Sequence, residues 1–160
     1  MRFRIAMPLV ALALPLAFAA GCSKEPADSG APHKHVHHPP HGGTPVVLGD
    51  EAYHMELVLD APNGVLQAYI FDGELENFIR SAVPSIEIDA LVGGSPRTLV
   101  LAAVANPATG ETVGDTSLFQ AQADWLRTTK DFDGVVKSVT IRGTTFTDVK
   151  FNFPKGNDTD

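Results

Sequence analysis

Short runs of alternating apolar and polar residues, separated by turn residues, fill the chain from Thr44 to Phe153. In YHMELVLD, residues 53–60, every second residue is large and apolar, a period of two that is typical of a half-buried β-strand. The following APNG contains a proline and an Asn-Gly pair, and VLQAYIFD comes next. Residues 53–72 are therefore predicted to form a β-hairpin.

Two further pairs of apolar runs have the same form. SIEIDALV and RTLVLAAV are joined by GGSP, and VVKSVTIR and TTFTDVKFNF turn at Gly143. SLFQAQ, between the two pairs, is predicted to be another strand, and DWLRTTKDF is predicted to start a short helix with Asp124 as its N-cap.

Seven to eight short strands with at most one short helix indicate an all-β fold over residues 44–156, a single antiparallel β-sandwich with an open barrel as the alternative. Periodicity does not specify which strand edges pair, so immunoglobulin-like and transthyretin-like strand orders both stay open. Residues 157–160 are expected to be a disordered tail.

The first 21 residues have the pattern of an export signal. Arg2 and Arg4 precede an uninterrupted apolar run from Ile5 to Ala20, and small residues then lead to Cys22. A single-pass membrane anchor is the alternative, but about twenty apolar residues are needed to cross a bilayer and Pro8 and Pro15 interrupt this shorter run. We therefore expect a signal peptide over residues 1–21.

The end of this segment, AFAAGC, resembles the lipobox of bacterial lipoproteins. The resemblance implies that Cys22 is acylated and becomes the first residue of the mature protein. Stable anchoring needs more than one acyl chain, which a diacylglyceryl cysteine provides. Ser23 follows in place of an aspartate, which in such proteins implies the outer membrane, here with the domain facing the periplasm. Because Cys22 is the only cysteine, the chain can form no internal disulfide or thiolate metal site.

Residues 22–43 have the composition of a disordered tether, since Val36 is their only large aliphatic residue. Without residues 1–21 the chain has ten Lys and Arg against nineteen Asp and Glu, a formal charge of −9 with neutral histidines. This balance argues against nucleic acid as a partner, because binding to nucleic acid depends on neutralising phosphates with Lys and Arg. An acidic surface instead tolerates or attracts cations.

The tether contains a dense histidine tract, PHKHVHHPPHGG at 32–43. Imidazole is the commonest metal-binding side chain, and closely spaced imidazoles on a flexible backbone can surround one ion. Nitrogen ligands suit Cu and Zn first, with Ni and Co behind them. The predicted ligands in the tract are His33, His35, His37, His38 and His41. A hydrophilic spacer with incidental histidines is the alternative.

A second part of the candidate metal site lies on the first hairpin. His54 and Glu56 are two residues apart, so both side chains leave the same face of the strand. With a three-residue loop His54 would face Asp72, giving a His/Asp/Glu cluster, whereas a two- or four-residue loop would place Gly73 or Phe71 there. The two glycines after His41 permit a close approach of that histidine to the hairpin. Ordinary solvent-facing residues are the alternative interpretation of His54 and Glu56.

The segments HGGTPVVLGDEAYHMELVLDAPNGVLQAYIFDGE and AVANPATGETVGDTSLFQAQADWL resemble small His-rich exported bacterial proteins found beside heavy-metal efflux systems of the resistance-nodulation-division type. A similar HGG…HxEL hairpin segment occurs in some periplasmic adaptor subunits of these systems. The matching positions are His41, Gly42, Gly43, His54 and Glu56. The resemblance implies an association with metal export and possible contact with efflux components, without specifying the metal.

The sequence therefore predicts an envelope lipoprotein that binds transition-metal ions for buffering, handover or efflux. No enzyme is expected, because there is no G-x-S-x-G element and five of the six histidines lie in the tether. The competing hypothesis is a non-catalytic interaction module that docks an efflux or envelope partner.

Overall fold

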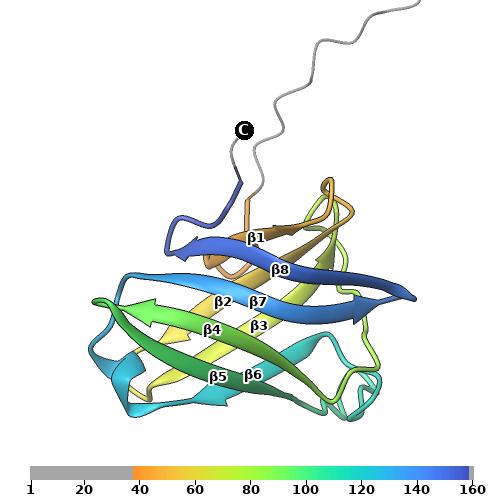
Figure 1. The fold of residues 1–160 in the computed structure, drawn as a ribbon. Coiled ribbons are helices and arrows are strands. Elements are labelled where there is room, and N and C mark those ends of the chain that lie inside the picture. The colour runs from red at the N-terminus through yellow and green to blue at the C-terminus, as the bar shows by residue number, and fades with distance from the viewer. Residues whose placement is uncertain (1–37, 159–160) are drawn as a thin grey trace, which may run out of the picture. The chain divides into compact units, whose positions relative to one another are not determined.

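The computed structural model describes residues 38–158 of the chain, which form one antiparallel sheet. Its eight strands are arranged in the order β1-β2-β3-β6-β5-β4-β7-β8 (Figure 1). The elements are β1 (Thr44–Leu48), β2 (Tyr53–Asp60), β3 (Val65–Asp72), β4 (Ser85–Val92), β5 (Ser95–Ala103), β6 (Leu118–Gln122), the 3-10 helix η1 (Asp124–Arg127), β7 (Phe132–Ile141) and β8 (Thr144–Phe153). The predicted all-β class is confirmed, and the strand order that the sequence left open is now defined.

The three predicted hairpins are present as β2-β3, β4-β5 and β7-β8, each with continuous antiparallel pairing or a short register shift at most. SLFQAQ supplies β6. One strand, β1, was not predicted. Its proline, Pro45, argues against a central strand, but β1 lies at the edge of the sheet, where a missing N–H is tolerated.

The sheet curls until its two edge strands, β1 and β8, approach each other. The residues after β8 join them: the Thr44 hydroxyl donates to the Pro154 carbonyl at 3.2 Å. The Asn157 side chain accepts from the Val47 N–H at 2.7 Å and donates to the Val47 carbonyl at 3.2 Å. Asn157, which the sequence analysis places in the tail, therefore continues the edge of β1 in the way a neighbouring strand would.

Alternate residues of the strands fill the interior with large apolar side chains. The residues that are fully buried include Leu48, Met55, Leu57, Leu66, Ile70, Ile86, Ile88, Leu101 and Phe119. Trp125 packs edge-on against Phe132, with ring centroids 5.8 Å apart, and so closes the core beside η1. The N-cap prediction for Asp124 was wrong, because the extended residue Ala123 occupies that position and Asp124 is the first residue inside the helix.

Within residues 38–158, no helix has the length and apolar character required to cross a lipid bilayer.

Candidate metal site around His41

Strand β2 is buried on both faces near its middle, which its alternating sequence does not indicate. Met55 and Leu57 face the core, as expected from the period of two. His54 and Glu56 point to the other face and are also fully buried. The interpretation of His54 and Glu56 as ordinary solvent-facing residues is therefore wrong. A segment that precedes β1 covers Glu56.

That segment is residues 39–43, which we call the strap. A turn closed by the Gly42 N–H and the Pro39 carbonyl, 2.9 Å apart, brings it back toward the sheet, and Gly42 has a φ of +67°. At Gly43, an added Cβ would lie 2.5 Å from the Leu57 carbonyl oxygen. Glycine at residue 43 is thus required by the close approach of the strap to β2, and the HGG sequence has a structural explanation.

The strap is held by the carboxylate of Glu56. Its Oε1 accepts hydrogen bonds from the backbone N–H of His41 at 2.8 Å and of Gly43 at 2.9 Å. Its Oε2 lies 2.7 Å from Nδ1 of the His41 ring. Both oxygens of a fully buried carboxylate are therefore engaged by the strap. In this position Glu56 orients His41 and is not presented to an ion as a ligand, which differs from the role predicted for it.

Glu56 and Tyr69 hold the His41 ring in one orientation. An ionised carboxylate only accepts hydrogen bonds, so in the neutral imidazole tautomer that donates to it the hydrogen is on Nδ1 and the lone pair is on Nε2. One face of the imidazole stacks on Tyr69, with centroids 4.1 Å apart and planes 17° apart. The side chain is still 35% exposed. His41 can thus bind a metal through Nε2 while Glu56 holds the opposite side of the ring.

Tyr69 faces Glu56 across the β2-β3 ladder, which places its ring under the strap. Burial, followed by the negative charge of Glu56, raises the pKa of the Tyr69 phenol. The phenol therefore remains a neutral hydroxyl near pH 7, and it donates to the Gln67 side chain at 3.3 Å. Tyr69 is thus a neutral platform for the imidazole.

His54 and Asp72 do not join His41. The hairpin has the four-residue loop, since Asp60 pairs with Val65, and this register places Phe71 opposite His54. Asp72 pairs with Tyr53, so it points to the other face of the sheet. The His/Asp/Glu cluster that a three-residue loop would give is absent from this hairpin.

The Asp72 carboxylate is used in the turn that follows β3. Burial opposes its ionisation, but the Asn77 side chain and the backbone N–H groups of Asn77, Glu76 and Glu74 donate to it and together lower its pKa. The Asn77 amide nitrogen lies 2.6 Å from Oδ2. Asp72 is therefore the anchor of a turn, and its predicted role as a ligand has no support in this geometry.

Of the other predicted ligands, His38 is exposed and lies three residues before His41. His33, His35, His37 and the acylation site Cys22 lie outside the described residues. Among residues 38–158 there is no group of three or more His, Cys, Asp or Glu side chains that could hold a metal. The structure thus brings together His41 and Glu56, with His38 close in sequence.

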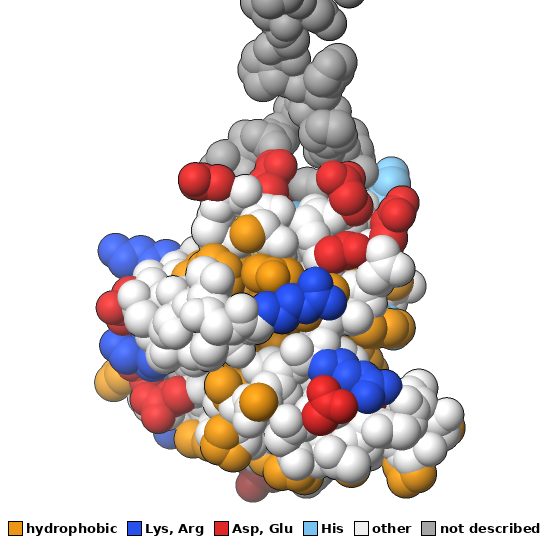
Figure 2. Space-filling view, turned by 90° about the vertical axis from the view of Figure 1, so that its right-hand side faces the viewer, with side chains coloured by type: hydrophobic (Ala, Val, Ile, Leu, Met, Phe, Trp, Pro, Cys, Tyr) orange, Lys and Arg blue, Asp and Glu red, His pale blue; other side chains and the backbone are white. Residues whose placement is uncertain are grey.

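Sequence reasoning missed the aromatic surroundings of His41. Phe71 and Phe78 lie 6.2 and 6.1 Å from the imidazole, measured between ring centroids. A loop of two or four residues places Tyr69 and Phe71 on the face that carries Glu56, whereas a three-residue loop does not, and the observed loop has four. The space-filling view of one side of the molecule shows several acidic side chains and a histidine near its top, with Lys and Arg side chains below them and along one margin (Figure 2).

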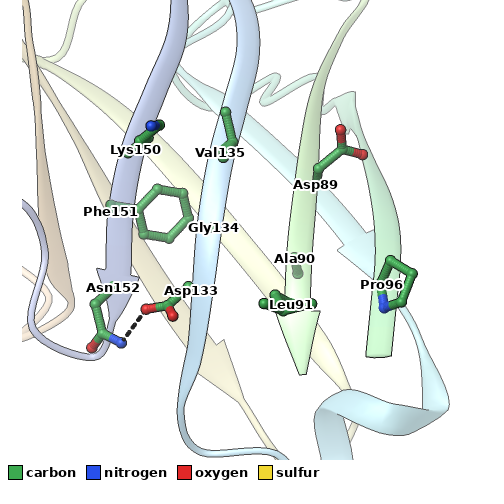
Figure 3. Close-up of a pocket in the computed structure, with 10 residues that line it drawn as sticks. All are labelled: Asp89, Ala90, Leu91, Pro96, Asp133, Gly134, Val135, Lys150, Phe151 and Asn152. Atoms are coloured by element: carbon green, nitrogen blue, oxygen red, sulfur yellow. Dashed lines mark hydrogen bonds between the residues drawn. The ribbon is translucent and has the colours of Figure 1, made fainter. Parts of the chain in front are cut away.

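A groove of about 620 Å³ lies elsewhere, over β4, β7 and β8. Apolar groups of Ala90, Leu91, Pro96 and Val135 line it, and the Phe151 ring lies beside Gly134 (Figure 3). Its two carboxylates accept hydrogen bonds: the Asn152 amide donates to Asp133 at 3.0 Å, and the Thr98 hydroxyl donates to Asp89 at 2.9 Å. The groove offers apolar contact area and no cluster of imidazoles.

The carboxylate of Glu111 stabilises the loop between β5 and β6. Burial opposes ionisation of Glu111, but hydrogen bonds from Thr109 and Ser117 and the charge of Arg80 lower its pKa. Arg80 also pairs with Asp115 at 3.0 Å. Each of these charged groups is thus used to hold the loop.

Comparison of the chain with protein-family models, with curated proteins and with solved structures gave no match.

Proposed function

We propose that this chain is an exported lipoprotein that binds transition-metal ions, with Cu or Zn as the main ions and Ni or Co as further ones. The observation that carries the proposal is the His41–Glu56 pair, in which a buried carboxylate fixes Nδ1 of the ring and leaves Nε2 for an ion. A carboxylate behind a metal-binding histidine is the usual arrangement in metal sites, because it orients the ring and raises its basicity.

The histidine tract supplies further nitrogen ligands to the same ion. His38 is three residues from His41, and His33, His35 and His37 precede it within five residues. Ligands on one short segment reach an ion already bound at His41 at high effective concentration. His41 is thus the fixed ligand, and the tract completes the coordination. Binding requires neutral imidazoles, so affinity falls as the pH drops through the range near 6.5.

The proposed location is the periplasmic face of the outer membrane, with acylated Cys22 in the bilayer. Seventeen residues separate Cys22 from Pro40, the residue before the anchored His41. Such a segment spans at most about 60 Å when fully extended. A metal-loaded domain at this distance from the membrane suits buffering in the envelope or delivery of ions to an efflux component.

A second candidate function is a non-catalytic interaction module, and one observation favours it. The groove over β4, β7 and β8 is lined mainly by apolar groups, and Leu91 beside it is 49% exposed. A partner from an efflux or envelope assembly would bury this surface, and the histidines would then be secondary.

Calorimetric titration separates the two functions. The chain from Ser23 to Asp160 keeps every histidine and every described residue, and it would be titrated with Cu, Zn, Ni and Co at pH 7.5. We expect micromolar or tighter uptake of Cu or Zn, weakened at least about tenfold by Glu56→Gln, because orienting groups behind metal ligands typically contribute that much. Glu87→Gln, the same change at an exposed residue of β4, is the matched control and should have no effect.

Deletion of residues 32–38 tests the contribution of the tract, and His41→Ala tests the anchored ligand. Loss of uptake in both variants supports the proposed site. If uptake is lost on deletion of residues 32–38 but kept in His41→Ala, His41 is not part of the metal site. If the unaltered chain takes up none of the four metals, metal binding is refuted and the interaction module becomes the better account.

A further inference from the structure

We propose that a cavity lined by Phe78 binds a neutral saccharide ring, a function separate from metal binding at His41. The cavity has a volume of about 290 Å³ and lies where the segment after β3 meets the loop between β5 and β6. This volume is close to the lower limit of small-molecule sites, about 300 Å³, so the cavity suits one ring better than a chain. Among the described residues that line it, His41 is absent.

Backbone hydrogen bonds hold the parts of the cavity together. Ser81 and Thr116 exchange N–H···O bonds of 2.9 and 3.2 Å, which join the segment after β3 to the loop. Within the loop, the N–H groups of Asn106 and Glu111 each donate to the carbonyl of the other residue, at 3.1 and 2.9 Å. The cavity is therefore formed before a ligand arrives, as in most small-molecule sites.

One part of the lining is apolar and consists of Tyr69, Phe78 and Leu118. The Tyr69 and Phe78 rings have centroids 6.2 Å apart and planes at 49° to each other, and Phe78 is 53% exposed. A pyranose ring has faces made largely of C–H groups, whose hydrogens are attracted to the negative faces of aromatic rings. A saccharide would thus cover an aromatic ring that is otherwise left in solvent.

The other part of the lining is polar, and its charges cancel. Glu111 is ionised near pH 7, because the hydrogen bonds and the Arg80 charge described above outweigh its burial and lower its pKa. The Arg80 Nε lies 3.9 Å from the Glu111 Oε1. A charged ligand would therefore meet a like charge as well as an opposite one in the same small cavity, which favours a neutral ligand.

These two charged groups keep part of their hydrogen-bonding capacity. A carboxylate has about four acceptor sites, and Glu111 uses three, for the Ser117 N–H, the Ser117 hydroxyl and the Thr109 hydroxyl. A guanidinium has about five N–H donors, and Arg80 gives two of them, to the Asp115 carboxylate and the Thr109 carbonyl. Both an acceptor and donors are thus left for a ligand.

Asn106 supplies a further donor. Its Oδ1 accepts a hydrogen bond from the Ala108 N–H at 3.1 Å, which orients the amide, and its Nδ2 donates to no other described residue. Sugar hydroxyls both donate and accept hydrogen bonds, so they can satisfy the amide, the guanidinium and the carboxylate at once. Planar polar groups beside aromatic rings are therefore the observation that specifies a saccharide.

The test uses sugars that differ mainly in charge. The chain from Ser23 to Asp160, without added metal, is titrated with N-acetylglucosamine and cationic glucosamine, and with glucose and anionic glucuronate, near pH 6.5, where the amine is protonated. Binding is followed through the backbone amide signals of Glu111 and Ser117 in two-dimensional NMR spectra. We expect millimolar, saturable binding of at least one neutral sugar, and binding at least about tenfold weaker for its charged counterpart.

Two substitutions separate the aromatic and polar contributions. Phe78→Ala should weaken binding of the neutral sugar about fivefold, the usual effect of losing an aromatic contact. Asn106→Asp keeps an oxygen for the Ala108 N–H but replaces the amide donor with a second acceptor, so it should weaken binding at least as much. Val100→Ala is the matched control for Phe78→Ala, because Val100 is 56% exposed on β5, and it should have no effect.

Absence of binding by both neutral sugars overturns the inference. Equal binding of a neutral sugar and its charged counterpart also overturns it, as does an affinity that Phe78→Ala and Asn106→Asp leave unchanged. Amide signals remote from the cavity show whether each variant is folded. None of these results bears on metal uptake by the same chain, so the proposed function is tested independently.

Discussion

On the outer faces of two parts of the same sheet, carboxylates differ in burial and in the number of hydrogen bonds that they accept. Over β2 and β3, the strap covers the sheet, and a fully buried carboxylate receives three hydrogen-bond donors. Over β4, β7 and β8 nothing among the described residues covers the groove, and Asp133 makes one exposed bond to Asn152. Five residues of strap thus convert an ordinary amphipathic strand into a polar site. The comparison shows that burial, more than residue type, separates a carboxylate that organises a neighbouring segment from a surface one.

The largest expected effect is on the free energy of unfolding when the carboxylates of Glu56 and Asp133 are removed one at a time. Glu56→Ala leaves the N–H groups of His41 and Gly43 without their acceptor, and we expect it to lower the free energy of unfolding by about 3 kcal/mol. Asp133→Ala in the groove should change it by less than about 0.5 kcal/mol, because Asp133 is exposed. Urea unfolding followed by circular dichroism measures both. Equal losses would show that the strap adds nothing to the fold.

Two glycines sharpen the same contrast. In Gly43→Ala the new methyl group would meet the Leu57 carbonyl, part of a strand that cannot move away, so we expect a loss of about 2 kcal/mol. In Gly134→Ala it would meet the ring of Phe151, and a side chain can shift more readily than a backbone carbonyl, so we expect about 1 kcal/mol. Thermal unfolding of the two variants shows which substitution costs more stability. A larger loss in Gly134→Ala would mean that the strap can move away from β2 at little cost.

The smallest expected effect is the pH dependence of the turn that carries Phe78. The pKa of Asp72 is lowered in the folded state, so its ionised form stabilises the fold above its ordinary pKa of 3.8. This contribution is lost as the pH falls below 3.8 and through the lower folded pKa. The difference in unfolding free energy between the unaltered chain and Asp72→Asn should therefore be largest near pH 7 and shrink toward pH 3. A difference that stays constant over this range would contradict the assignment.

The sequence was sufficient to predict the parts of the fold that depend on local pattern. The alternation in YHMELVLD and the Asn-Gly turn fixed β2 and the hairpin, and Gly143 located the last turn. β1 was missed because TPVVL is short and contains Pro45. This strand is held by pairing with β2 and by Asn157, which lies 110 residues after its partner Val47. Contacts between distant residues leave no periodic signal.

For the candidate site, the sequence predicted its members better than its geometry. The spacing of two positions from His54 to Glu56 was sufficient to place them on one face, and the glycines after His41 indicated close approach to the hairpin. The register was not predictable, because loops of two, three or four residues are all compatible with APNG. That single uncertainty determined whether Asp72 or Phe71 faced His54, and hence whether the surroundings of the site were acidic or aromatic.

The contact of Thr44, in β1, with Pro154, just after β8, places the start and the end of the domain side by side. A short linker between residues 157 and 44 could join them, and new ends could be opened at Gly93 and Gly94, a turn with open space around both residues. Such a circularly permuted domain would keep all eight strands but lack the strap. Its stability would therefore show how well the sheet holds Glu56 without the N–H groups of His41 and Gly43.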